Sequence, residues 1–229
     1  MMSSLQCARR GRHFFLGIEG IMDDLGTDAL LTTTRAVRKR LNFNQAVGLD
    51  TICECLRIAV QAPTGGGEEQ TSFVIIDRPD IKARLGEIFR EATLPVFSEK
   101  YANADTRTAK RAYAGGIYLA RNLERVPVLV LFCMDGRMTN EGNARFAGFY
   151  GSVVPTIWNF QLALRSRGLG STYITGYLSR EAEVASLLGI PYETVSQIAL
   201  VPVAYTVGTR FRAAQRLPLA GRCFRNSWG

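Results

Sequence analysis

The run Val126-Pro127-Val128-Leu129-Val130-Leu131-Phe132 is apolar throughout and rich in β-branched side chains. A short apolar run of this kind is typical of a strand buried inside a sheet. Extended to Met134, it is the longest apolar run in the chain, yet it is far shorter than the roughly 20 apolar residues that a membrane-spanning helix needs. The run therefore predicts a soluble protein built around a buried strand.

Helical and extended patterns alternate on either side of this run. The expected strands are 73–76, 171–175 and 198–203, and the expected helices are 50–62, 80–90, 111–123, 152–167 and 181–188. Asp50 and Asp80 are expected to cap the first two helices, and Gly168 and Gly189 to end the last two. Two further segments, 92–108 and 135–148, show no helical period and are interpreted as a mobile connection and a loop. Because no repeat or linker interrupts this order, we expect one domain over residues 22–229.

The composition of the chain argues against several kinds of partner and catalytic site. The chain of 229 residues carries a net charge of +8, which is spread without any block of five or six basic residues. Since charge alone is a weak sign of nucleic-acid binding, we do not expect a nucleic-acid partner. The one histidine, His13, lies near the N-terminus, which argues against a Ser-His-Asp triad or a histidine-ligated metal in the folded body. If the protein is an enzyme, a cofactor is expected to supply its chemistry.

The cysteines indicate neither a metal site nor an extracellular scaffold. They stand at positions 7, 53, 55, 133 and 223 and form no CxxC motif. Cys53 and Cys55 are two residues apart in a helical pattern, so they point to different faces and make a poor pair of metal ligands. We therefore expect no metal and a cytoplasmic location.

Residues 1–21 differ from the rest of the chain. Arg9, Arg10 and Arg12 precede a short apolar patch, which glycines and acidic residues interrupt too soon for a signal peptide. We interpret this segment as a disordered extension. A second hypothesis is that translation begins at Met22, where a plausible domain start lies.

The first candidate binding segment is Thr34-Arg35-Ala36-Val37-Arg38. Arg35 and Arg38 are three residues apart and would share one face of a helix. Two such guanidinium groups suit a dianionic phosphate. The alternative is a basic turn that faces water, as Lys39 and Arg40 are expected to do.

The second candidate is Ala62-Pro63-Thr64-Gly65-Gly66-Gly67. A phosphate loop needs the order strand, glycines, helix, whereas here the order is helix, glycines, strand. The neighbouring Glu68 and Glu69 would also repel a phosphate. The glycines are therefore expected to meet a neutral ring or chain, the alternative being a plain flexible turn.

In order and spacing these segments resemble the FMN-dependent nitroreductase family, with features of its actinobacterial-type members. The similarity runs from about Thr34 to Trp228. The further matching segments are Tyr118-Leu119-Ala120 with Val126-Pro127-Val128-Leu129-Val130, Ser152-Val153-Val154-Pro155-Thr156-Ile157-Trp158-Asn159, Gly168-Leu169-Gly170-Ser171, Leu188-Gly189-Ile190-Pro191 and Arg216-Leu217-Pro218-Leu219.

The resemblance implies an α+β fold, with a mixed sheet flanked by helices, in an intertwined homodimer that holds FMN at the subunit interface. It implies an NAD(P)H-dependent FMN oxidoreductase that reduces a nitroaromatic, quinone or enone by a ping-pong mechanism, with NADH or NADPH as co-substrate. Arg35, Arg38 and Arg216 would hold the phosphate, and Thr175 and Gly176 would lie near the redox-active nitrogen of the flavin. Pro63, Thr64 and Gly65, from the partner subunit, would line the ring or the ribityl chain. Ala36, Gly66, Gly67 and Glu69 complete the expected cofactor-binding set.

The chain departs from the family pattern mainly in the glycine loop. The family usually has amide side chains, which hydrogen-bond flavin, at the positions of Gly67 and Glu69, and neither residue here can replace them fully. Other departures are Thr71, Trp158 and Ala204. They leave open an alternative function, in which the protein binds or sequesters FMN without catalysis.

Overall fold

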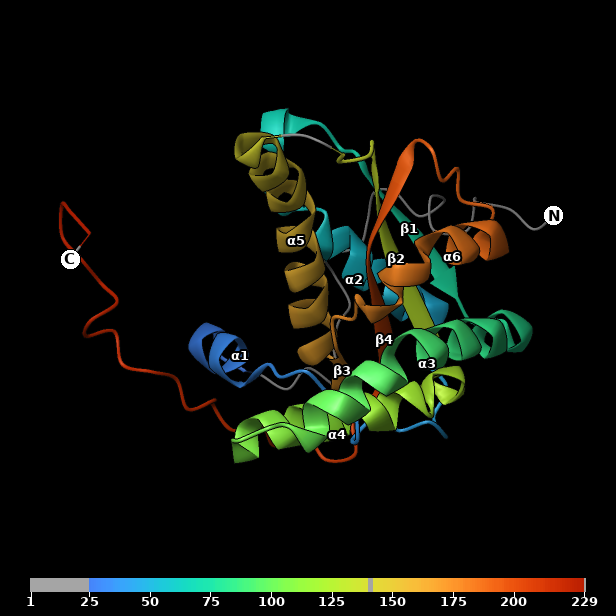
Figure 1. Cartoon of the computed structure of the whole chain (residues 1–229), viewed down its shortest axis with the longest axis horizontal. Helices are drawn as coiled ribbons and strands as arrows, with labels where there is room; N and C mark the ends of the chain where they lie inside the picture. The colour runs from blue at the N-terminus through green and yellow to red at the C-terminus, as the bar shows by residue number, and fades with distance from the viewer. Residues whose placement is uncertain (1–24, 140–141, 229) are drawn as a thin grey trace.

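Within the described residues, the sheet has four strands in the order β1-β2-β4-β3. They are β1 (Thr71–Ile76), β2 (Val128–Asp135), β3 (Leu169–Ser171) and β4 (Val195–Tyr205). The computed structural model describes residues 25–139 and 142–228 (Figure 1), so the predicted extension 1–21 and the hypothetical start at Met22 lie outside the described residues. All neighbouring strands are antiparallel. Parallel pairing, expected of a mixed sheet, is confined in the described chain to single-residue bridges such as Ala36–Ser171.

The β2 strand confirms the prediction from the apolar run. Its residues alternate between two core clusters, with Val130 and Phe132 in one and Leu129 and Leu131 in the other. Because successive side chains of a strand point to opposite faces, this strand is covered on both sides. Its near-continuous apolar sequence follows from that double burial.

Helices cover both faces of the sheet (Figure 1). One face packs against α2 (Leu49–Ala59) and α5 (Asn143–Arg165). The other packs against α3 (Pro79–Ala102), α4 (Arg107–Ala120) and α6 (Glu181–Leu188). A short α1 (Thr27–Thr33) precedes them, and 3₁₀ turns lie at Gly65–Gly67, Leu123–Arg125 and Gly176–Arg180. None of the helices in the described part of the chain is long and apolar enough to cross a membrane.

Of the two predicted irregular segments, 92–108 is mostly helical, so the prediction was wrong there, whereas 135–148 is helical only from Asn143 onward. The segment 92–108 is the second half of α3 up to Ala102, followed by the start of α4. Its period was hidden because Thr93 occupies a core position and Pro95 lies inside the helix. Thr93 is tolerated there because its hydroxyl donates to the carbonyl of Phe89 at 2.6 Å. Likewise, α5 begins at Asn143 and not at Ser152.

Smaller differences concern the ends of elements. Gly48, not Asp50, is the N-cap of α2, and Asp50 lies in the first turn. The strand expected at 171–175 is β3, which ends at Ser171, with Ile174 making only a bridge to Leu200. The prediction for α6 is confirmed at both ends, and Gly189 caps it in the left-handed conformation with φ +67°.

The burial of two thiols predicts their reactivity. Cys55 and Cys133 are buried, and burial raises the pKa of each thiol to about 12, whereas Cys223 is exposed. Because the thiolate is the reactive form, we expect a thiol-alkylating reagent at pH 8 to modify Cys223 rapidly and to reach Cys55 and Cys133 only in denaturant. Peptide mapping by mass spectrometry checks this. Equal labelling of all three in the native protein would contradict the described packing.

Candidate functional site

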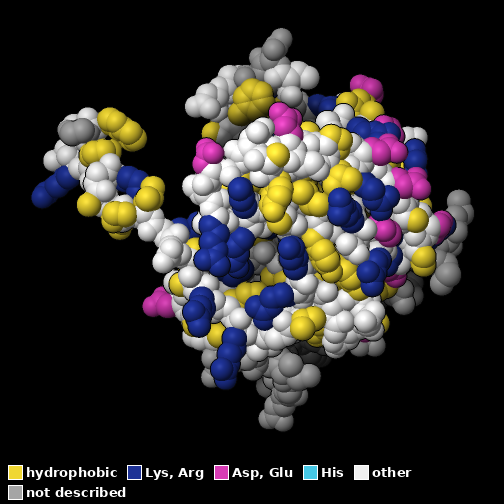
Figure 2. Space-filling model, turned by 60° about the horizontal axis from the view of Figure 1, so that its bottom comes forward, with side chains coloured by type: hydrophobic (Ala, Val, Ile, Leu, Met, Phe, Trp, Pro, Cys, Tyr) yellow, Lys and Arg dark blue, Asp and Glu magenta, His cyan; other side chains and the backbone are white. Residues whose placement is uncertain are grey.

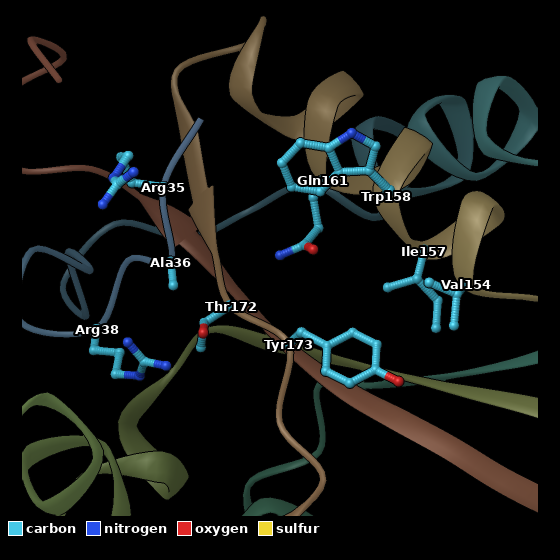
Figure 3. Close-up of a pocket in the computed structure, with 9 residues that line it drawn as sticks. All are labelled: Arg35, Ala36, Arg38, Val154, Ile157, Trp158, Gln161, Thr172 and Tyr173. Carbon is cyan, nitrogen blue, oxygen red and sulfur yellow. The ribbon is translucent and has the colours of Figure 1, made fainter. Parts of the chain in front are cut away.

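A cavity of about 440 Å³ opens between the segment 35–38, helix α5 and the residues that follow β3. It is lined by Arg35, Ala36, Arg38, Val154, Ile157, Trp158, Gln161, Thr172 and Tyr173. Figure 3 shows that these residues come from the segment 35–38 and, much later in the chain, from α5 and the residues just after β3. Three of the residues predicted for cofactor binding, Arg35, Ala36 and Arg38, therefore meet here.

The local structure of the arginine segment differs from the prediction. Residues 34–38 are not helical: Ala36 forms a bridge to Ser171, and the Val37 amide donates to the Ser171 carbonyl at 2.8 Å. Val37 is buried with 4% of its surface exposed, so the alternation of an extended chain turns Ala36 and Arg38 to the other side. Both arginines line the cavity from a segment that is not helical, so they do not share a helix face.

Arg35 and Arg38 form the cationic side of the cavity. Within residues 25–139 and 142–228, neither the Arg35 nor the Arg38 guanidinium has a hydrogen-bond acceptor or an ion-pair partner. Burial lowers the pKa of Arg38, which reflects the cost of desolvating an unpaired charge. Its side chain points toward Thr172 (Figure 3), whose fully buried Oγ1 has no hydrogen-bond partner among the residues that the structure describes. These groups together favour an anionic ligand with acceptor oxygens.

Helix α5 and Tyr173 supply the apolar and aromatic side chains of the cavity. Val154, Ile157, Trp158 and Gln161 follow the helical spacing i, i+3, i+4, i+7 on α5. Trp158 and Tyr173 remain 40% and 37% exposed, and Gln161 is fixed because its Nε2 donates to Ser171 Oγ at 3.1 Å. Burial, and after it the charge of Tyr150, raises the pKa of Tyr173, so this phenol stays neutral at physiological pH. Sequence reasoning missed Thr172, Tyr173 and Gln161, for which no motif gave a signal.

Arg40 was expected to face water, but the structure gives it partners within the protein. Its guanidinium donates to the carbonyls of Val207 at 2.8 Å and Arg210 at 3.1 Å and lies 4.2 Å from the centre of the Phe211 ring. Arg40 thereby fixes the beginning of the chain that leaves β4. Lys39 is exposed, as expected.

The glycine loop lies on α5 but does not line the cavity. The Gly65 amide donates to Ser152 Oγ at 2.9 Å, and that hydroxyl donates in turn to the Gly148 carbonyl. Gly66 and Gly67 adopt φ +69° and +72°, where residues with a side chain are strained. Pro63, Thr64 and Glu69 belong to the same loop and likewise stay outside the cavity. One chain therefore does not bring the two predicted motifs together.

The remaining residues predicted for cofactor binding, Thr175, Gly176 and Arg216, do not line the cavity either. Thr175 and Gly176 are exposed and begin the turn after Tyr173, close to its rim in sequence. Arg216 is exposed on the segment that follows β4, which extends away from the body of the molecule (Figure 1). No cluster of three or more metal-binding side chains occurs among the residues that the structure describes.

The fold is α+β, with an antiparallel sheet covered by helices on both faces. Its cavity, with cationic and aromatic side chains, suits a flat, anionic ligand. Residues 31–205 match the nitroreductase family. The chain belongs to this family, so the resemblance of its motifs to the nitroreductase family is confirmed, as is the predicted α+β fold with helices on both faces of the sheet.

Solved structures share the fold at low sequence identity. An iodotyrosine deiodinase bound to FMN and 3-iodo-L-tyrosine is 20% identical with a TM-score of 0.65, covering 86% of this chain and 97% of the other. A BluB-like flavoprotein from Clostridium difficile 630 is 16% identical with a TM-score of 0.66, covering 88% and 99%. A putative nitroreductase in complex with FMN from Desulfovibrio desulfuricans is 18% identical with a TM-score of 0.60, covering 86% and 95%. No curated protein matches the sequence.

Proposed function

We propose that this protein is an FMN-dependent oxidoreductase that takes a hydride from NADH or NADPH and reduces a small oxidising substrate. The observation that carries the proposal is that Arg35 and Arg38 line a cavity and that, among the described residues, neither guanidinium group nor the Thr172 hydroxyl beside them has a partner. Two structurally similar proteins are bound to FMN. Family membership favours redox chemistry over sequestration.

The residues present fit the cofactor. The phosphate of FMN is a dianion, which two cations and a hydroxyl donor can satisfy in a site partly withdrawn from water. Trp158 on α5 and Tyr173 after β3 offer flat apolar surfaces at the cavity, where a ring system would be shielded from solvent. When bound, FMN supplies the hydride acceptance and release that no side chain of this cavity provides.

Each side chain has a distinct task in this proposal. Arg35 and Arg38 bind and orient the phosphate, and Thr172 donates its hydroxyl proton to an acceptor oxygen. The hydrogen bond from Gln161 to Ser171 holds the Gln161 side chain in one position at the cavity. The backbone amides near Thr175 and Gly176 are proposed to stabilise negative charge on the reduced ring.

The site is proposed to be completed in a homodimer. The loop formed by Pro63, Thr64, Gly65, Gly66, Gly67 and Glu69 does not reach the cavity of its own chain, so it would serve the cavity of a partner subunit. Arg216, on an extended arm fixed at its base by Arg40, is proposed as a further phosphate ligand. Sedimentation that finds only monomers in the presence of FMN would remove this part of the proposal.

An absorbance spectrum followed by anaerobic titration tests the function. We expect the purified chain to bind FMN, to appear yellow, and to bleach when NADH or NADPH is added without oxygen. Re-oxidation by a quinone or nitroaromatic should then restore the colour. Protein that takes up no FMN contradicts the proposal, and a yellow protein that neither nicotinamide bleaches favours the alternative, a non-catalytic FMN-binding protein.

A further inference from the structure

A second cavity, of about 370 Å³, lies where α3 ends and α4 begins. Its charged lining comes from Asp105, Arg107, Lys110 and Arg111, and Tyr101 adds an aromatic side chain. It shares no lining residue with the cavity that holds Arg35 and Arg38. Figure 2, which brings the lower side of the molecule forward, shows Lys and Arg side chains spread over much of this face.

The three cations of this cavity repel one another. Arg107, Lys110 and Arg111 stand at i, i+3 and i+4, so they lie on one side of α4, and all three are exposed. The helix contains no acidic residue that could separate them. Like charges at these spacings destabilise a helix, and cations in its first turns also oppose the helix dipole. The cluster therefore lowers the local stability in the absence of an anion.

Arginines on the neighbouring helix α3 have carboxylate partners. On α3, Arg84 pairs with Glu87 at 2.8 Å and Arg90 pairs with Glu124 at 3.0 Å. In the described parts of the chain, by contrast, none of the three α4 cations has an ion-pair or hydrogen-bond partner. Asp105 is the single carboxylate in the lining, which leaves an excess of positive charge for a ligand.

Helix α4 connects this cluster to the first cavity. A Cβ added at Gly115 would lie 3.2 Å from Arg38 Cδ, so the Arg38 side chain rests directly on α4. Arg111 precedes Gly115 by one turn, which corresponds to a rise of about 6 Å. An extended ligand could therefore reach from the first cavity to the basic one along this helix.

We propose that the basic cavity binds the adenosine 2′-phosphate end of NADPH and makes this chain prefer NADPH to NADH. The inference rests on the proposed function, which needs a nicotinamide reductant. The two reductants differ only by one phosphomonoester, a near-dianion that the three cations of α4 would recognise. Tyr101, 43% exposed, offers its ring for stacking with the adenine base.

Calorimetry with the full-length chain tests the site without any flavin reduction. The probes are 2′,5′-ADP, 5′-AMP, which lacks the 2′-phosphate, and inorganic phosphate. We expect 2′,5′-ADP to bind at least about tenfold more tightly than either other probe at low salt, and its affinity to fall as salt is raised. Equal affinity for 2′,5′-ADP and 5′-AMP would overturn the assignment, as would inorganic phosphate binding as tightly as 2′,5′-ADP.

Matched double variants locate the site. In K110Q/R111Q the preference for 2′,5′-ADP should disappear, while R121Q/R225Q, with the same loss of charge at two exposed positions, should retain it. The melting temperature of K110Q/R111Q should not fall, because the substitutions relieve repulsion. The ratio of kcat/KM for NADPH to that for NADH should drop by about tenfold in this variant only. A retained preference in K110Q/R111Q overturns the proposal.

The outcomes for the two proposals can be told apart. Protein that binds no FMN yet distinguishes 2′,5′-ADP from 5′-AMP refutes the oxidoreductase function and leaves the basic site standing. Protein that NADH and NADPH bleach with equal kcat/KM supports the oxidoreductase and refutes the NADPH site.

Discussion

Replacing Arg38 by glutamine should weaken FMN binding by about 10- to 100-fold, since hydrogen bonds to charged groups contribute about 1.5–3 kcal/mol. Arg38 is half-buried at the cavity and has no partner within the described chain. Its charge is therefore available to a phosphate. Fluorescence titration of the flavin-free protein with FMN measures the change.

The same substitution should leave the flavin-free protein as stable as before, or slightly more stable. Burial already lowers the pKa of Arg38, so the unliganded fold gains nothing from holding the charge. Opposite effects on affinity and stability separate a binding residue from a structural one. Thermal melting without FMN supplies the second measurement, and a large loss of stability would refute this interpretation.

Lys39→Gln is the matched control. It removes the same charge from the adjacent, exposed residue, which does not line the cavity. We expect its FMN affinity to change by less than about threefold, because exposed charges are screened by solvent and salt. If both variants lose affinity equally, then general attraction, and not a specific phosphate contact, is responsible.

Gly170→Ala should destabilise the fold by about 1–3 kcal/mol, the usual cost of overpacking. Gly170 lies in β3 opposite Ala204. A Cβ there would stand 2.5 Å from Thr206 Cγ2 and 3.0 Å from Val37 Cβ. Val37 cannot yield easily because it is buried and branched at Cβ, so the segment carrying Arg38 would have to move. FMN affinity should therefore fall together with stability.

Gly148→Ala is expected to change the stability in the opposite direction. Gly148 lies inside α5, and nothing stands within 4 Å of the Cβ position. Alanine is favoured over glycine in a helix by up to about 1 kcal/mol, so this variant should be more stable than the parent chain. Urea unfolding of both variants without FMN tests the pair. A Gly170→Ala protein as stable as the parent would mean that the contact between β3 and residues 36–37 is loose.

Much of the fold could be predicted because its signals are local. The apolar run at 126–132 indicated β2, and the pattern ending in Gly189 gave α6 with its bounds. The order of short motifs from Thr34 onward indicated the family that residues 31–205 match. The second half of α3 escaped prediction because a threonine and a proline interrupt its apolar period, and only packing against the sheet compensates for them.

For this protein the sequence by itself determined the family, the buried strand and the choice of Arg35 and Arg38 as candidate phosphate-binding residues. Residue type and spacing, on which these predictions depend, are properties of the chain alone. Only the tertiary structure decided how those arginines reach one cavity. The bridge between Ala36 and Ser171 brings Arg35 and Arg38 beside Thr172, Tyr173 and the Trp158 face of α5. Such pairing joins segments far apart in the chain, so it depends on the whole core and leaves no mark in local spacing.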